Sequence, residues 1–161
     1  MEKHPGRERP VALRPASAAD FSEMHRVRMS VRENRLSNPA SVQPGDYESI
    51  LDRNGRAWVA ELGQRIIGFA VADIARSNVW ALFVDPEAEG RGVGRRLHDT
   101  MMAWMFSAGA AEVWLTTGPG TRAERFYRCA GWRHAGMEPS GEARYVMTRE
   151  QWLAAASPSV I

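Results

Sequence analysis

An apolar segment, a glycine-rich turn and a segment with helical spacing follow one another in the middle of this sequence. Residues 79–84 (Val-Trp-Ala-Leu-Phe-Val) are typical of a buried strand, and residues 85–96 (Asp-Pro-Glu-Ala-Glu-Gly-Arg-Gly-Val-Gly-Arg-Arg) contain the turn. Such a turn leaves several backbone N–H groups unpaired at the N-terminus of the following helix, where the helix dipole is positive. The sequence therefore predicts a phosphate or pyrophosphate site between strand and helix.

The glycine spacing excludes two common nucleotide-binding motifs. Counted from Gly90, the pattern Gly-x-Gly-x-x-Gly needs a glycine at the position of Arg95. A P-loop needs a lysine beside serine or threonine, and Lys3 is the only lysine of the chain. We therefore expect the backbone amides of residues 91–95 to hold the phosphates, with a charge-assisted contact from the side chain of Arg91 or Arg95.

Length and composition favour one folded domain over residues 1–161, with residues 1–10 as a frayed N-terminal segment. The 44% hydrophobic and 25% charged residues are typical of a globular protein. The sequence contains no apolar run long enough to cross a membrane and no signal-peptide core, so a cytoplasmic location without membrane attachment is expected. A net charge of +2 gives no reason to expect nucleic acid as a partner.

No metal site is expected from the cysteine and histidine spacing. A single cysteine, Cys129, excludes an internal disulfide and is expected to pack within its helix. His25, His98 and His134 lack the spacing of metal ligands, and we expect each at the surface or at a helix cap.

The order of the predicted elements is two helices, an antiparallel run of strands, and then strand–helix–strand–helix–strand. This order predicts a mixed α/β fold with helices on both faces of one sheet. Helices are expected from Ser17-Ala18-Ala19-Asp20 to Asn38-Pro39, from about 45 to 53, from the glycine turn to Gly109, and from the capping box 121–124 to Gly131. Strands are expected at 11–13, 57–62, 65–74, 79–84, 112–117, 132–137 and 143–148.

Two motifs resemble the GCN5-related N-acetyltransferase (GNAT) family. Residues 89–94 are similar to the family's cofactor motif Gln/Arg-x-x-Gly-x-Gly/Ala at Gly92 and Gly94, with Glu89 at the first position. Residues 120–132 are similar to Asn-x-Arg-Ala-x-x-Phe/Leu-Tyr-x-x-x-Gly-Phe, with Gly120 in place of the asparagine. The motifs are correctly ordered and about thirty residues apart, and the resemblance covers nearly the whole chain.

The resemblance implies a mixed, mostly antiparallel sheet with a V-shaped split between the strand ending at Val84 and the strand ending at Thr117. The pantetheine arm of acetyl-CoA, the co-substrate, would lie in this split, and a homodimer is one expected assembly. Residues expected to contact acetyl-CoA lie on the strand before the turn, in the turn and around the second motif: Leu82, Phe83, Val84, Arg91, Gly92, Val93, Gly94, Arg95, Thr117, Gly120, Arg122 and Tyr127.

The resemblance also implies two catalytic groups. Tyr127 would protonate the departing thiolate, and a phenol with an ordinary pKa of about 10 carries its proton at neutral pH. The other interpretation of Tyr127 is a core aromatic beside Phe126. The backbone amide of Val84, or of Phe83 beside it, would stabilise the oxyanion.

The acceptor side is expected at the first helix and the following loop. Candidate general bases are Glu33, Glu61 and Asp73, each of which is otherwise a surface carboxylate, and a water chain is the alternative. Candidate acceptor contacts are Glu33, Arg35 and Trp80. Arg28, Arg32 and Arg35 share one helical face, which is either solvated or a site for a carboxylate or phosphate.

The predicted function is transfer of an acetyl group from acetyl-CoA to a primary amine of a small molecule or peptide by direct attack. The alternative is a non-catalytic acyl-CoA sensor or regulatory module with the same fold. The identity of the amine and the length of the acyl chain stay open.

Overall fold

The computed structural model describes residues 10–31 and 42–156. Within these residues the strands are β1 (Ala12–Pro15), β2 (Arg56–Leu62), β3 (Arg65–Asp73), β4 (Asn78–Val84), β5 (Glu112–Thr117), β6 (Arg133–Met137) and β7 (Ala143–Thr148). The α-helices are α1 (Phe21–Ser30), α2 (Pro44–Asp52), α3 (Val93–Ser107), α4 (Arg122–Cys129) and α5 (Arg149–Ala156).

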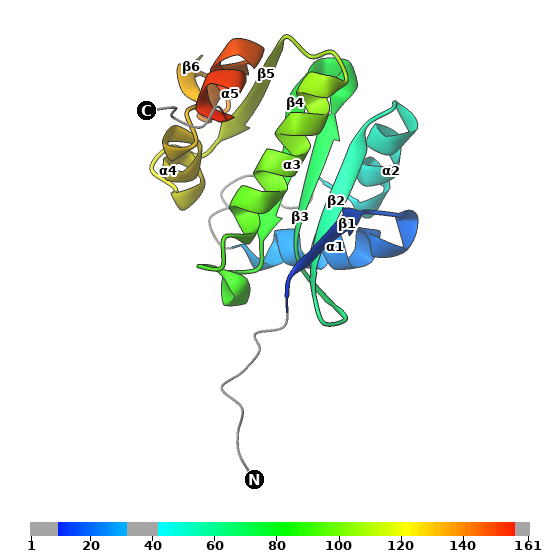
Figure 1. Cartoon of the computed structure of the whole chain (residues 1–161). Coiled ribbons are helices and arrows are strands. Elements are labelled where there is room, and N and C mark those ends of the chain that lie inside the picture. Colours follow the sequence, from blue (N-terminus) through cyan, green and yellow to red (C-terminus); the bar gives the residue numbers. More distant parts are fainter. Residues whose placement is uncertain (1–9, 32–41, 157–161) are drawn as a thin grey trace.

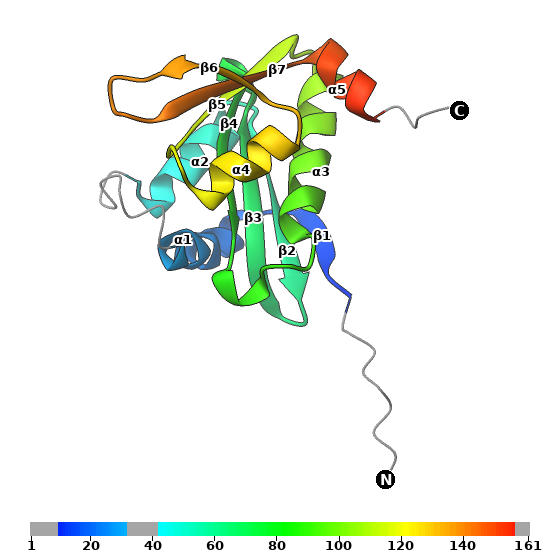
Figure 2. The same ribbon diagram turned by 90° about the vertical axis from the view of Figure 1, so that its left-hand side faces the viewer.

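The strands form one seven-stranded sheet in the order β1-β2-β3-β4-β5-β7-β6. All neighbouring strands run antiparallel except β4 and β5, which are parallel. Figures 1 and 2 show α1 and α2 on one face of this sheet and α3 on the other. The predicted mixed, mostly antiparallel sheet with helices on both faces is confirmed.

Each face of the sheet has its own hydrophobic core, and this follows from the spacing of the apolar residues. On α3 the buried side chains recur every three or four residues, as in Leu97, Met101 and Met105, and they pack with Val113 and Leu115 of β5. On the opposite face Met24 and Val27 of α1 pack with residues of α2 and the sheet. The two cores fix the helices on either side of β4.

β4 and β5 separate directly after they begin, as the predicted V-shaped split requires. Asn78 and Trp114 are the paired residues between them, where the Trp114 N–H donates to the Ser77 carbonyl at 3.0 Å. Beyond this point β5 pairs with β7 on its other side, up to Thr117 and Ala143. The edge of β4 that faces β5 is therefore open toward Val84.

β4 also contains a bulge. Ala81 is opposite Val71 and Val79 is opposite Ala72, so Trp80 is the extra residue. Without a bulge, Trp80 and Phe83 would lie on opposite faces because their separation is odd. Instead both pack on the core beside α1 and α2, whereas Leu82 and Val84 pack on the α3 side.

The predicted elements agree with the structure with a few differences. β5 and β7 have the predicted bounds, and α1 ends at Ser30, while Asn38-Pro39 lies outside the described residues. Helix α5 was not predicted, although Thr148 and Gln151 form reciprocal cap bonds (2.9 and 3.2 Å) whose Thr-x-x-Gln spacing is visible in the sequence. In the predicted capping box at α4, Thr121 Oγ1 accepts from the Glu124 N–H, but the Glu124 carboxylate accepts from the Gly120 N–H.

Candidate active site

The glycine-rich turn connects β4 to α3, and two of its glycines have a backbone that favours glycine. Gly90 and Gly92 have φ of 81° and 73°, in the left-handed region, and Gly92 is the N-cap residue of α3. Gly94 lies in the first turn of α3, where an added Cβ atom would be 3.5 Å from Cγ2 of Val84. The turn therefore brings the N-terminus of α3 against the last residue of β4.

The backbone N–H groups at this N-terminus are uncapped. The N-cap residue, Gly92, has no side chain that could accept a hydrogen bond from them. The first backbone hydrogen bond of the helix runs from the Arg96 N–H to the Gly92 carbonyl at 3.1 Å. The N–H groups of Val93, Gly94 and Arg95 thus point out of a 15-residue helix at its positive end. Arg91 is exposed beside them, whereas the Arg95 side chain pairs with Asp99 at 3.2 Å. This set of donors fits a pyrophosphate.

The backbone of β4 offers further donors at its open edge. The Asp85 N–H donates to the Ile67 carbonyl at 2.8 Å, so it faces β3. Because N–H groups alternate in direction along a strand, the N–H of Phe83 also faces β3, and those of Leu82 and Val84 face the opposite side, where β5 has separated. The geometry favours Val84 over Phe83 as an oxyanion donor. The bulge lies earlier in β4, at Trp80.

Tyr127 lies on α4, where its side chain is buried in the same core cluster against which Leu82 and Val84 pack. Its ring contacts Phe126 and Trp132, with centroids 5.4 and 5.6 Å away. Within the described residues no hydrogen bond engages its hydroxyl. Burial raises the pKa of the phenol above its ordinary value, so the hydroxyl keeps its proton at neutral pH.

Gly120, which replaces the asparagine of the second motif, has φ of 75°. Glycine and asparagine are the residues that most readily adopt this left-handed conformation. The substitution therefore removes the asparagine side chain but keeps the left-handed backbone conformation. The Gly120 N–H donates to Glu124 Oε1 at 3.0 Å. Thr117 is buried at the end of β5, directly before this turn.

Glu89, which replaces glutamine or arginine in the first motif, forms an ion pair with Arg122 of the second motif. The pair joins the glycine turn to the first turn of α4. The spacing of these two residues in the sequence does not indicate that they meet.

On the predicted acceptor side, the Arg28 side chain lies over two aromatic rings. The Arg28 guanidinium carbon lies 5.0 Å from the ring centre of Trp80 and 4.9 Å from that of Phe83. Its Nη1 atom is buried and has no hydrogen-bond partner among the described residues, which ordinarily costs about 1–3 kcal/mol. Arg28 therefore does not belong to a solvated basic face.

The predicted general bases are not brought together at this site. Glu61 pairs with Arg14 at 2.5 Å at the β1–β2 edge, two strands away from β4. Asp73 is buried near Arg53 (3.4 Å) opposite Asn78, where β4 and β5 are still paired. Glu33, like Arg32 and Arg35, lies outside the described residues.

Two other predictions about single residues were wrong. His98 is fully buried instead of lying at the surface or at a helix cap. Its burial is possible because both ring nitrogens have hydrogen-bond partners. Trp132 Nε1 donates to His98 Nε2 (2.9 Å), so the proton resides on Nδ1, which bonds Asp99 Oδ1 (2.8 Å). Cys129 is exposed instead of packing within its helix, since it is the last residue of α4.

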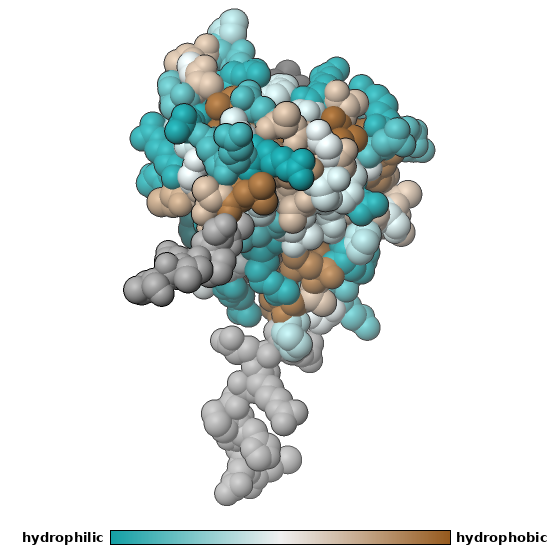
Figure 3. Space-filling view, turned by 45° about the horizontal axis from the view of Figure 1, so that its top comes forward, coloured by the Kyte–Doolittle hydropathy of each residue, from teal (hydrophilic) through white to brown (hydrophobic). Residues whose placement is uncertain are grey.

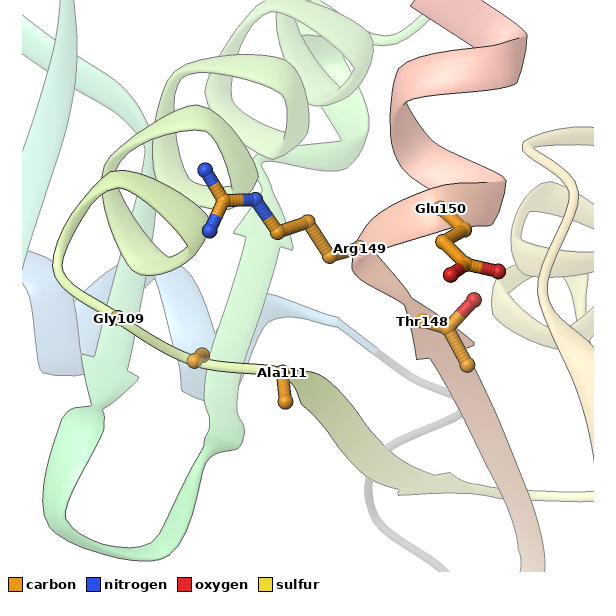
Figure 4. A pocket seen from close by; sticks show the side chains of 6 residues that line it. Gly109, Ala111, Thr148, Arg149 and Glu150 are labelled. Atoms are coloured by element: carbon orange, nitrogen blue, oxygen red, sulfur yellow. The ribbon is translucent and has the colours of Figure 1, made fainter.

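Outside this region, a pocket of about 440 Å³ lies between the α3–β5 turn and the start of α5. Figure 4 shows it lined by Gly109, Ala111, Thr148, Arg149 and Glu150, none of which was predicted as a site residue. No group of side chains among the described residues could hold a metal ion, and no described helix is long and apolar enough to cross a membrane. On the face shown in Figure 3, hydrophilic and hydrophobic residues are interspersed.

Solved structures share this fold. An acetyltransferase of the GNAT family from Staphylococcus aureus Mu50 matches with a TM-score of 0.73 and 17% identity, over 86% of this chain and 99% of its own. PaiA N-acetyltransferase from Thermoplasma acidophilum, in complex with coenzyme A, matches with a TM-score of 0.69 and 15% identity, over 86% of this chain and 99% of its own. The ribosomal-protein-S18-alanine N-acetyltransferase from Escherichia coli matches with a TM-score of 0.68 and 16% identity, over 86% of this chain and 92% of its own. A comparison with curated proteins finds no match.

The split sheet and the uncapped helix beside it define the fold of acetyltransferases that use an acyl-CoA. The model of the acetyltransferase (GNAT) family matches residues 19–132, more than half of the chain and inclusive of both motifs. The chain therefore belongs to the GNAT family, which uses acetyl-CoA, and the resemblance seen in the sequence is confirmed.

Proposed function

We propose that this protein is an acetyl-CoA-dependent N-acetyltransferase that acts on a primary amine of a small molecule or peptide by direct transfer. One observation carries the proposal: the uncapped N-terminus of α3 lies against the open end of β4, with Tyr127 in the adjoining core. Anion-binding amides, an oxyanion donor and a proton donor are the three groups that this reaction needs.

The residues present fit acetyl-CoA. The N–H groups of residues 91–95 would hold the pyrophosphate, and Arg91 and Arg122 are the nearby cations. The pantetheine arm would lie along Leu82, Phe83 and Val84, where the split leaves main-chain groups of β4 without a neighbouring strand, and near Thr117 and Gly120. Acetyl-CoA would supply the thioester whose carbonyl carbon accepts the amine.

Two groups of this chain would act on the reaction. The N–H of Val84 would donate to the carbonyl oxygen as it gains negative charge, and it needs no rearrangement because the strand holds it. Tyr127 would give its hydroxyl proton to the departing sulfur, and its burial supports this because the phenol stays protonated. Glu33 stays a candidate for taking the proton of the amine, and Glu33, Arg35 and Trp80 stay candidates for contacting the acceptor.

A steady-state assay of free CoA, with acetyl-CoA and a panel of primary amines, tests the proposal. An acetyltransferase releases CoA in proportion to the acceptor consumed. A protein that binds acetyl-CoA but releases no CoA with any amine would be a sensor, and the proposal would be wrong. A single domain over residues 1–161 and a cytoplasmic location are part of the same proposal and rest on the sequence. A homodimer is one assembly that the family resemblance implies.

A further inference from the structure

We propose that Arg28 binds a carboxylate of the acceptor, so that the preferred acceptor is a small amine that also carries a carboxylate. This inference rests on the proposed function, because it names the substrate class of the same site. It is carried by the position of one guanidinium between two rings and by its unsatisfied donor.

The Arg28 guanidinium is held in place by aromatic rings. It lies about 5 Å from the ring centres of Trp80 and Phe83, which share a face only because the β4 bulge corrects their odd spacing. A guanidinium that lies over aromatic rings keeps its planar N–H edge available for a bidentate acceptor. The bulge therefore places two aromatic rings on one face of β4, where together they bind the Arg28 guanidinium.

One nitrogen of this cation, Nη1, has unsatisfied donors. Arg28 Nη1 is buried without a hydrogen-bond partner, and no ion pair involves Arg28 within residues 10–31 and 42–156. Arg26, two residues earlier, shows the contrast: it pairs with Glu23 at 3.1 Å and Asp85 at 3.3 Å and donates to the Ile66 carbonyl. A carboxylate from the acceptor would give Nη1 of Arg28 the acceptor atom that the described residues do not provide.

The surroundings favour a carboxylate over a phosphate. The guanidinium is surrounded by the rings of Trp80 and Phe83 and by the nearby Tyr47. Burial raises the pKa of the Tyr47 phenol, and the Arg28 side chain lowers it in part through its charge and a hydrogen bond. A single guanidinium, such as that of Arg28, carries one positive charge and neutralises one negative charge. A phosphate dianion would call for a second cation, and no second arginine among the described residues is recorded over the rings of Trp80 and Phe83.

The position of Arg28 also limits the size of the acceptor. Phe83, which the guanidinium covers, is directly followed by Val84, whose N–H is the proposed oxyanion donor. The Phe83 side chain is on the α1 and α2 face, and the Val84 side chain is on the face of α3 and the glycine turn. The acceptor would therefore approach from the face opposite the glycine turn, with its carboxylate only a few bonds from its amine.

The test is calorimetric titration of the full chain, with CoA present, using α-amino acids, β-alanine and 4-aminobutyrate, each matched with its carboxamide. At least one carboxylate should bind tenfold or more tightly than its carboxamide. Arg28→Met, which keeps an unbranched apolar side chain, should abolish this preference. Arg56→Met is the matched control, because Arg56 covers the ring of Trp104 (4.9 Å) on the other side of the sheet, and this variant should keep the preference.

Acetyl-CoA is titrated into every variant to separate the outcomes. Unchanged acetyl-CoA binding by Arg28→Met shows that the fold and the cofactor site are intact. Equal binding of carboxylates and carboxamides by the wild type, failure of every carboxylate to bind, or a preference that survives in Arg28→Met would each overturn the inference. Absence of CoA release with all amines would overturn the proposed function instead, since the titrations do not depend on turnover.

Discussion

The Arg122 guanidinium donates a hydrogen bond to the Glu89 carboxylate, and this ion pair joins the glycine turn to the start of α4. Both residues belong to motifs expected to contact acetyl-CoA, and Glu89 is where this chain departs from the first motif. The pair accounts for the departure, because the carboxylate neutralises a cation beside the proposed phosphate site. An anionic cofactor would have to compete with Glu89 for Arg122.

Replacement of Glu89 by glutamine should strengthen acetyl-CoA binding about two- to fivefold, since an exposed ion pair is worth up to about 1 kcal/mol. The dissociation constant can be measured by calorimetry at low and high salt, and the gain should shrink at high salt. Glu87→Gln is the control, because Glu87 is 80% exposed and lies 3.6 Å from Arg65 instead. Weaker binding by Glu89→Gln would contradict this account.

Replacement of Tyr127 by phenylalanine should lower the single-turnover rate of acetyl transfer about 100-fold or more, because the proton donor is lost. The dissociation constant of acetyl-CoA should change little. Thermal stability should also change little, since no hydrogen bond of the Tyr127 hydroxyl is lost among the described residues. Rapid-quench measurement of acetylated amine gives the rate, and an unchanged rate would remove Tyr127 from the mechanism.

Tyr145→Phe is the matched control for this experiment. The Tyr145 hydroxyl donates to Glu124 Oε2 at 3.0 Å and accepts from Arg128 Nε at 2.7 Å. Its loss should cost about 1–3 kcal/mol in the free energy of unfolding while the single-turnover rate stays near that of the wild type.

The buried His98 should make stability depend on pH. Burial lowers the pKa of the His98 imidazole in the folded protein below the ordinary value of about 6.5. Below that pH the unfolded chain binds a proton that the folded protein does not, so the free energy of unfolding decreases as pH falls. We expect Tm to fall from pH 7 to 5.5.

The His98→Gln variant should show a smaller slope of Tm against pH over this window than the wild type. Equal slopes for wild type and His98→Gln would show that this imidazole is not the group responsible.

Most of the fold could be predicted because local signals agree with the tertiary structure. β5 and β7 have buried residues that alternate with half-buried or exposed ones, and the glycine turn and α3 follow directly from sequence spacing. The missed helix α5 carries its own signal in Thr148 and Gln151, which cap one another. Its second half is rich in alanine, with Leu153, Ala154 and Ala155 exposed, and contains no clear apolar stripe.

The relationships between distant residues could not be predicted. The bulge at Trp80 is a property of the pairing with β3, and a single strand sequence does not reveal it. The position of Arg28 over Trp80 and Phe83 depends on that bulge. His98 looked like a surface histidine on a polar stretch, and its burial depends on the Trp132 indole, 34 residues away.

The central claim, that acetyl-CoA binds where α3 begins, is tested most directly by titrating Gly94→Trp beside wild type. Gly94→Ala is the control, because its Cβ atom would make only an ordinary 3.5 Å contact with Val84. The account predicts that wild type and Gly94→Ala bind acetyl-CoA and that folded Gly94→Trp does not. Wild-type affinity in Gly94→Trp, or no binding by the folded wild type, would contradict it.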